Sequence, residues 1–230
     1  ALAEAPEQLR THEGVRAIVL SGEGKSFCSG LDVMSLMSSP DLMARAFEPA
    51  EGTQGNYVQH VAMGIGRLPV PVISAIHGRC YGGGLQIALG ADMRVVAPDA
   101  ELSVMEIRWG LVPDMGITVT LRDMMRKDTA KWLTMSGEIV NGEKAVALGL
   151  ATRVDAAPVD CALEMAAIIA SKSPDAIRGA KTLFDEAWHA PESAALAREA
   201  EIQQGLLGKP NQMEAVSAAL QKRSPRFSEV

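Results

Sequence analysis

The sequence predicts an α/β fold with a helical C-terminal region, and two observations carry this prediction. Up to residue 154, short apolar runs alternate with helical patterns and Gly-rich turns. Beyond residue 155 the pattern is helical throughout. We therefore expect an α/β core over residues 1–154 and a helical region over residues 155–230.

The expected strands are short apolar runs. The clearest are VRAIVL at 15–20, VPVISAI at 70–76 and DMRVVA at 92–97, and two shorter runs lie at 101–104 and 151–154. Turn residues or helical patterns follow these runs, which is the arrangement expected of an α/β core.

The first expected helices lie between these strands. Residues 31–68 read as irregular helix interrupted by prolines and glycines, either a mobile segment over a site or a poorly packed connector. Residues 85–91 and 141–150 predict compact helices, and residues 115–135 predict a longer one that stops at Gly137.

The C-terminal helices are predicted by periodicity and by a capping motif. Apolar residues at 159, 163, 166, 167 and 170 share one helical face. Ser173, Pro174 and Asp175 then supply an N-cap, a first-position proline and a first-turn acid for the next helix.

Composition limits the possible partners and compartment. With 22 Lys and Arg against 28 Asp and Glu, the net charge is −6, which argues against a nucleic-acid interface. No apolar run approaches the ~20 residues of a membrane span, so we expect no membrane insertion. Three cysteines without CxxC spacing disfavour disulfides or structural zinc and suit the cytoplasm. Because the chain begins at Ala1 inside a helical pattern, we expect a missing upstream segment.

Two Gly-rich turns each follow an expected strand. Gly82, Gly83 and Gly84 lie between a strand and a helix, and the second turn spans residues 27–32. One unpaired N–H from each turn would suit an oxygen that becomes negatively charged during a reaction. Tight packing explains the glycines equally well, and helix capping is the simpler role for Asp32. The GEGKS segment is no phosphate loop, because position 19 is Val19 rather than glycine.

The segments KSFCSGLD, HGRCYGGGLQIALGADMRVVAPDAELSVMEIRWGLVPDMG and NGEKAVALGLATRV resemble the crotonase (enoyl-CoA hydratase/isomerase) superfamily. The resemblance is close over residues 15–154 and looser beyond. It implies a spiral of ββα units, a homotrimer or hexamer, an acyl-CoA thioester substrate and a place in fatty acid metabolism. It implies no metal and no cofactor beyond the coenzyme A of the substrate.

The resemblance also implies binding residues. The two backbone N–H donors of the family's oxyanion hole fall on Leu31 and Gly83. The family's CoA-contacting lysine falls on Lys25, and Ser29 lines the CoA path. Leu31 and Gly83 are therefore expected to contact the thioester as well.

Departures from the family pattern bear on the reaction. The two positions that hold glutamate in the family's hydratases carry Gln86 and Glu106 here. An amide cannot exchange a proton at neutral pH, so Glu106 is left as the expected proton carrier. Asp114 stands where many relatives have glycine, and it is expected either to act on the substrate or to cap a helix beginning at Met115.

The leading functional hypothesis is therefore double-bond isomerisation of an enoyl-CoA, favoured over hydration. The alternatives are a thioester hydrolase or a ring-substrate isomerase that uses Asp114. A hypothesis from a different functional class is an acyl-CoA-binding protein with vestigial catalysis.

Overall fold

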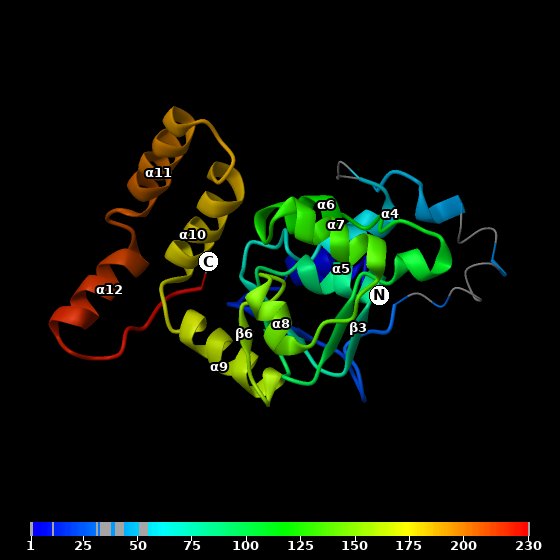
Figure 1. The fold of residues 1–230 in the computed structure, drawn as a ribbon. Helices are drawn as coiled ribbons and strands as arrows, with labels where there is room; N and C mark the ends of the chain where they lie inside the picture. Colours follow the sequence, from blue (N-terminus) through cyan, green and yellow to red (C-terminus); the bar gives the residue numbers. More distant parts are fainter. Residues whose placement is uncertain are drawn as a thin grey trace.

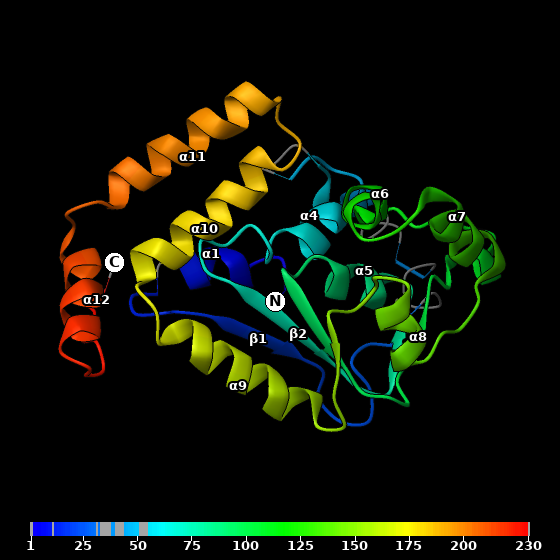
Figure 2. The ribbon, with the colours of Figure 1, turned by 60° about the vertical axis from the view of Figure 1, so that its left-hand side comes forward.

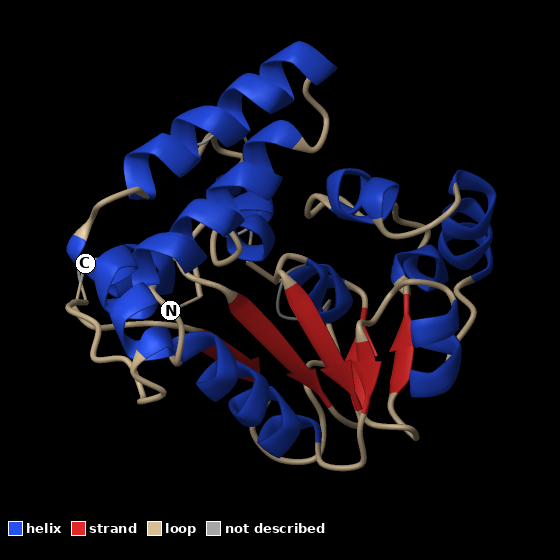
Figure 3. Cartoon of the chain, turned by 90° about the vertical axis from the view of Figure 1, so that its left-hand side faces the viewer, coloured by secondary structure: helices blue, strands red, loops and turns tan. Residues whose placement is uncertain are grey.

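A four-stranded parallel sheet lies at the centre of the molecule (Figure 3). The computed structural model describes residues 2–10, 12–30, 32, 38–39, 44–50 and 55–229. The strand order is β1 (Ile18–Ser21), β2 (Val72–Ile76), β4 (Met93–Val96) and β6 (Arg153–Val154). These strands confirm four of the five expected ones, although they are shorter than the apolar runs that predicted them.

A second, two-stranded parallel sheet positions the Gly-rich turns. It pairs β3 (Arg79–Tyr81) with β5 (Glu101–Ser103). β5 confirms the strand expected at 101–104. β3 was not expected, because its three residues lie within a segment that reads as a turn.

The first part of the chain carries short helices, several of which lie side by side next to the central sheet (Figures 1 and 2). They are α1 (Ala5–Arg10), α4 (Tyr57–Met63), α5 (Gly83–Leu89), η1 (Glu106–Trp109), α6 (Ile117–Thr120), η2 (Leu121–Asp123), α7 (Lys127–Ser136) and α8 (Gly142–Ala147). The prediction of a continuous helix over 115–135 is wrong, because Arg126 adopts an extended conformation with ψ of 142°. Gly137 ends α7 in the left-handed conformation, as predicted.

The C-terminal part is helical, as expected. It consists of α9 (Pro158–Ala170), α10 (Pro174–Ala187), α11 (Glu192–Leu206) and α12 (Pro210–Leu220). The Ser173 side chain accepts a hydrogen bond from the Ala176 N–H and caps α10. α9 packs on one face of the central sheet, and α11 and α12 lie farther out (Figure 2). The boundary at residue 154 remains a prediction.

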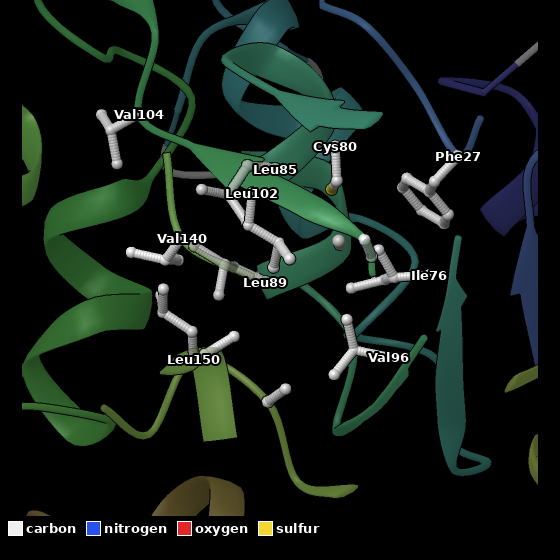
Figure 4. Close-up of a cluster of buried hydrophobic side chains, with 14 of the residues drawn as sticks. Phe27, Ile76, Cys80, Leu85, Leu89, Val96, Leu102, Val104, Val140 and Leu150 are labelled. Carbon is white, nitrogen blue, oxygen red and sulfur yellow. The ribbon is translucent and has the colours of Figure 1, made fainter. Parts of the chain in front are cut away.

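The largest hydrophobic cluster joins both sheets to α5 and to the Gly-rich turn at residues 27–32 (Figure 4). Its buried side chains include those of Phe27, Ile76, Cys80, Leu85 and Leu102. This packing fixes the position of the two turns. No helix in the described part of the chain is long and apolar enough to cross a membrane.

Candidate active site

The two Gly-rich turns lie next to each other, as the sequence predicts. The Cys28 N–H donates to the Arg79 carbonyl and the Tyr81 N–H donates to the Cys28 carbonyl, both at 3.0 Å. These bonds make an isolated parallel bridge between Cys28 and Cys80. A Cβ added at Gly30 would lie 4.0 Å from the Gly83 nitrogen. The end of the turn at residues 27–32 therefore lies against the start of α5.

Gly82, Gly83 and Gly84 have distinct roles in this geometry. Gly82 has φ of 54° and ψ of −123°, and its N–H donates to the Ser103 carbonyl at 3.0 Å. A Cβ added at Gly84 would lie 2.6 Å from the carbonyl oxygen of Cys28. Gly83 opens α5, and its N–H has no acceptor among the described residues. The donor expected at Gly83 is therefore available to a ligand, whereas Leu31 lies outside the described residues.

Glu106 lies beside these glycines, at the start of η1. A Cβ added at Gly82 would lie 3.5 Å from the Glu106 Oε1 atom. The side chain is half-buried, and its Oε2 atom is buried without a hydrogen-bond partner among the described residues. Burial raises the pKa of Glu106, and the negative charge of Asp114 raises it further. This environment favours a carboxyl group that exchanges protons over an ordinary surface glutamate.

Gln86 is held on both sides by hydrogen bonds. Its side chain is 2% exposed, its Oε1 accepts from the Met115 N–H at 2.8 Å, and its Nε2 donates to Glu106 Oε1 at 2.7 Å. Because a backbone N–H can only donate, the first bond fixes which end of the amide faces Glu106. Gln86 therefore orients Glu106 and has no proton of its own to exchange.

Asp114 does not cap a helix. The helix expected to begin at Met115 begins at Ile117, and its N-cap is Gly116 in the left-handed conformation with φ of 96°. The capping interpretation of Asp114 is therefore wrong, because Asp114 lies two residues before the N-cap and no side chain of the described residues caps this helix. Its side chain is exposed and lines a cavity of about 350 Å³.

Ser29 lies in the turn at residues 27–32 and Lys25 lies just before it, and both side chains are exposed. A backbone hydrogen bond holds the start of this turn, because the Phe27 N–H donates to the His77 carbonyl at 2.8 Å. His77 Nε2 lies 3.1 Å from the Gly24 carbonyl. The structure thus brings Gln86, Glu106 and Asp114 together near Gly83. Ser29 lies between Cys28 and Gly30, which are both close to the glycine turn, whereas Lys25 lies farther back along the chain.

Sequence reasoning missed the residues that surround the cavity next to Asp114. Gln59 and His60 of α4 line it, and the Met115 Sδ lies 3.0 Å from the position of a Cβ at Gly83. The capping box formed by Asn56 and Gln59 is visible in the sequence as an Asn followed three residues later by a Gln. That signal predicts the start of α4, but it does not reveal that the helix faces the site.

Comparisons with known proteins agree with this geometry. A family model described as enoyl-CoA hydratase/isomerase matches residues 1–230. A probable enoyl-CoA hydratase of Bacillus subtilis (strain 168) is 30% identical over 229 residues, covering 98% of this chain and 86% of that protein. The mitochondrial Delta(3,5)-Delta(2,4)-dienoyl-CoA isomerase of Mus musculus is 31% identical over 234 residues, covering 98% of this chain and 71% of that protein.

Solved structures give the same result. An enoyl-CoA hydratase from Bacillus anthracis superposes with a TM-score of 0.89 at 26% identity, covering 98% of this chain and 86% of that one. An enoyl-CoA hydratase from Polaromonas sp. JS666 gives a TM-score of 0.88 at 29% identity, covering 99% and 88%.

Proposed function

The chain belongs to the enoyl-CoA hydratase/isomerase family, and from this premise we propose that it shifts the double bond of a 3-enoyl-CoA to the 2-position, with Glu106 carrying the proton. Its fold class is the crotonase-like α/β class that the sequence predicts. Its relatives include both hydratases and dienoyl-CoA isomerases, so a lyase or isomerase acting on an acyl-CoA thioester is established at the family level.

One observation supports isomerisation over hydration. The Gln86 amide lies between the Met115 N–H and the Glu106 carboxylate, where a second proton-exchanging carboxyl would be needed to add water. Isomerisation needs only one such group, which removes a proton at one carbon and returns it at another. The proton count is then unchanged over the whole reaction.

The proposed chemistry uses two features of the site. The thioester oxygen accepts from the Gly83 N–H and, by family resemblance, from the Leu31 N–H, so that the enolate charge is stabilised as it forms. The Glu106 carboxylate removes a proton from C2, and the same group delivers it to C4. A raised pKa suits this exchange, because the pKa of the carboxyl group then lies closer to neutral pH.

A second candidate role follows from Asp114. Its negative charge acts on Glu106, so two carboxyl groups are within electrostatic reach of each other. With Asp114 as a second proton carrier, the site would move a double bond over a longer conjugated acyl group or within a ring substrate. The dienoyl-CoA isomerases among the relatives make this the nearest alternative.

Deuterium exchange tests the proposal directly. The protein is incubated in D₂O with 3-hexenoyl-CoA, and mass spectrometry follows the label. We expect conversion to 2-hexenoyl-CoA, with deuterium entering in proportion to the exchange of the Glu106 proton with solvent, and no addition of water to 2-butenoyl-CoA. Rapid hydration would contradict the isomerase assignment. Thioester cleavage would favour the hydrolase, and binding without exchange would favour the vestigial acyl-CoA-binding protein.

We also propose that the chain assembles into a trimer or hexamer, and that Lys25 and Ser29 contact the CoA portion of the substrate. Large apolar side chains that are exposed on the single chain support assembly: Trp109, Val112, Trp132, Trp188 and Leu220. Light scattering coupled to size-exclusion chromatography measures the mass of the assembly, and a monomeric mass would contradict the proposal.

A further inference from the structure

A cavity of about 350 Å³ separates α4 from the segment that leads into α6. α4 and α6 lie near each other in both Figure 1 and Figure 2. Met63 of α4 closes one side, since its Sδ lies 2.8 Å from the position of a Cβ at Gly116. Ile117 and Val119 supply further apolar wall.

The cavity adjoins the candidate active site through Asp114 and Met115. Asp114 lines the cavity and acts electrostatically on Glu106. Met115 joins the two regions, because its N–H donates to Gln86 and its Sδ lies close to Gly83. Asp114, which lines the cavity, and Met115, which packs against Gly83, are consecutive residues, so the cavity lies next to the proposed thioester site.

Hydrogen-bond donors lie along the α4 side of the cavity. Gln59 and Met63 of α4 line the cavity, and so does Arg67, which lies in the turn that follows the end of α4. The Gln59 Oε1 accepts from the Asn56 N–H at 3.0 Å, so its NH₂ group is left as a donor. Arg67 has no ion-pair partner among the described residues, and it is the one Lys or Arg among the described residues that line the cavity; it also lines the neighbouring cavity of about 760 Å³.

We propose that this cavity receives the far end of an acyl group that carries a terminal carboxylate, with Arg67 and the Gln59 NH₂ as its partners. The inference rests on the proposed function, because that function places the thioester at Gly83 and Glu106. A guanidinium matches a carboxylate in charge and geometry, and the apolar wall of Met63 and Ile117 suits the methylene groups between.

One feature of the cavity favours a different ligand, and the test includes it. His60 Nε2 lies 3.2 Å from the Ala3 carbonyl and therefore donates to it, which leaves Nδ1 as a buried acceptor without a partner among the described residues. A terminal hydroxyl would reach that acceptor only after the His60 side chain moves, because the atom is not exposed, whereas a carboxylate uses Arg67.

The test measures binding of three saturated thioesters of equal chain length by titration calorimetry. The ligands are hexanoyl-CoA, 6-hydroxyhexanoyl-CoA and the CoA monothioester of hexanedioic acid. We expect the carboxylate ligand to bind about tenfold or more tightly than hexanoyl-CoA. Arg67→Gln should remove that preference, and Arg67→Lys should keep part of it. Arg10→Gln, which removes a positive charge outside the cavity, should leave the preference intact.

Three results would overturn the inference: no preference for the carboxylate, a tighter hydroxyl ligand, or an equal loss for all three ligands in Arg67→Gln. The last result would mean that Arg67 serves the CoA portion. Saturated thioesters do not isomerise, so a carboxylate preference in a protein that fails to convert 3-hexenoyl-CoA would overturn only the proposed reaction. Absence of binding by every thioester would overturn both.

Discussion

Glu106 has one carboxylate oxygen bonded to Gln86 and the other buried without a partner among the described residues. Replacing it by glutamine keeps an acceptor for Gln86 but removes the exchangeable proton. We expect Glu106→Gln to lower the isomerisation rate by ~10²–10⁴-fold. Binding of hexanoyl-CoA should stay close to that of the wild type. A variant that retains more than about a tenth of the rate would remove Glu106 from the proposed mechanism.

The pKa of Glu106 predicts the pH dependence. As a base, Glu106 acts in its ionised form, so kcat/KM falls as the pH drops through its pKa. Burial raises that pKa, and the charge of Asp114 raises it too, so the fall should lie at a higher pH than for an ordinary glutamate.

Asp114→Asn removes one of the two contributions and should move the acid limb of the pH profile to lower pH. If Asp114 also transfers a proton, the maximal rate should fall by ~10²-fold or more as well. A pH profile identical to that of the wild type would show that the Asp114 charge does not reach Glu106 in solution.

Gln86→Glu tests whether the lack of a second carboxyl prevents hydration. The new carboxyl would face Glu106 Oε1, which lies 2.7 Å from the amide nitrogen it replaces. Like charges at this distance raise one pKa, so one group should stay protonated and the other ionised. We expect a gain in water addition to 2-butenoyl-CoA, measured as loss of the conjugated thioester absorbance. A folded variant without this gain would show that the attacking water has no room.

At the residue scale, the resemblance to the family was enough to single out Gln86, Glu106 and Asp114 as candidate site residues. It could not predict that the Met115 N–H fixes the Gln86 amide, because that contact joins positions 29 residues apart through tertiary structure. It also could not separate the two interpretations of Asp114. Those depended on where the helix begins, and the left-handed conformation of Gly116 decides that point.

At the scale of the elements, the start of α5 carries the proposed oxyanion donor. Gly83 is the first helical residue, a position where proline is tolerated and where only the N–H is lost. We expect Gly83→Pro to lower the rate by ~10²–10³-fold while the variant still unfolds cooperatively.

Gly83→Ala is the matched control for that variant. It keeps the N–H, and its Cβ would meet only the flexible end of Met115. Alanine should therefore retain much more activity than proline. Equal losses in both variants, measured at equal folded fraction by circular dichroism, would assign the effect to the side chain instead of the donor.

The elements themselves were predictable to the extent that local pattern decided them. β2 and β4 are buried apolar runs, and Ser173 and Gly137 mark helix ends with local chemistry. β3 escaped prediction because three residues between turns show no periodicity, and it is a strand only through its pairing with β5. The prediction of one helix over 115–135 failed for a similar reason, because apolar periodicity does not reveal the extended conformation of Arg126.

At the scale of the whole molecule, an ion pair attaches α10 to the central sheet. Lys181 Nζ lies 2.5 Å from Asp92 Oδ2, and the same oxygen accepts from the Val72 N–H at 2.7 Å. The Lys181 side chain is 7% exposed, so this pair is largely shielded from water. Lys181 also lines a cavity of about 760 Å³ between α10 and the core.

We expect Lys181→Met to lower the free energy of unfolding by about 1–3 kcal/mol, because Asp92 would keep a half-buried charge with one partner fewer. Urea denaturation measures the loss, and hydrogen exchange should show faster opening of α10. Lys144→Met is the control: that lysine forms an exposed pair with Glu138 and should change little. Equal stability in both variants would show that the ion pair does not hold α10 in place.

The three consecutive glycines have a consequence for how this site tolerates variation. In a saturation library, position 82 should accept almost nothing, because its backbone lies at a positive φ that L-residues rarely adopt. Position 84 should also reject every side chain, since even a methyl group would overlap the backbone of Cys28. Position 83 alone should yield folded variants, and these should divide according to whether the N–H survives. A selection for the amount of folded protein would therefore remove variants at positions 82 and 84. Only a selection for catalytic turnover would distinguish proline from alanine at position 83.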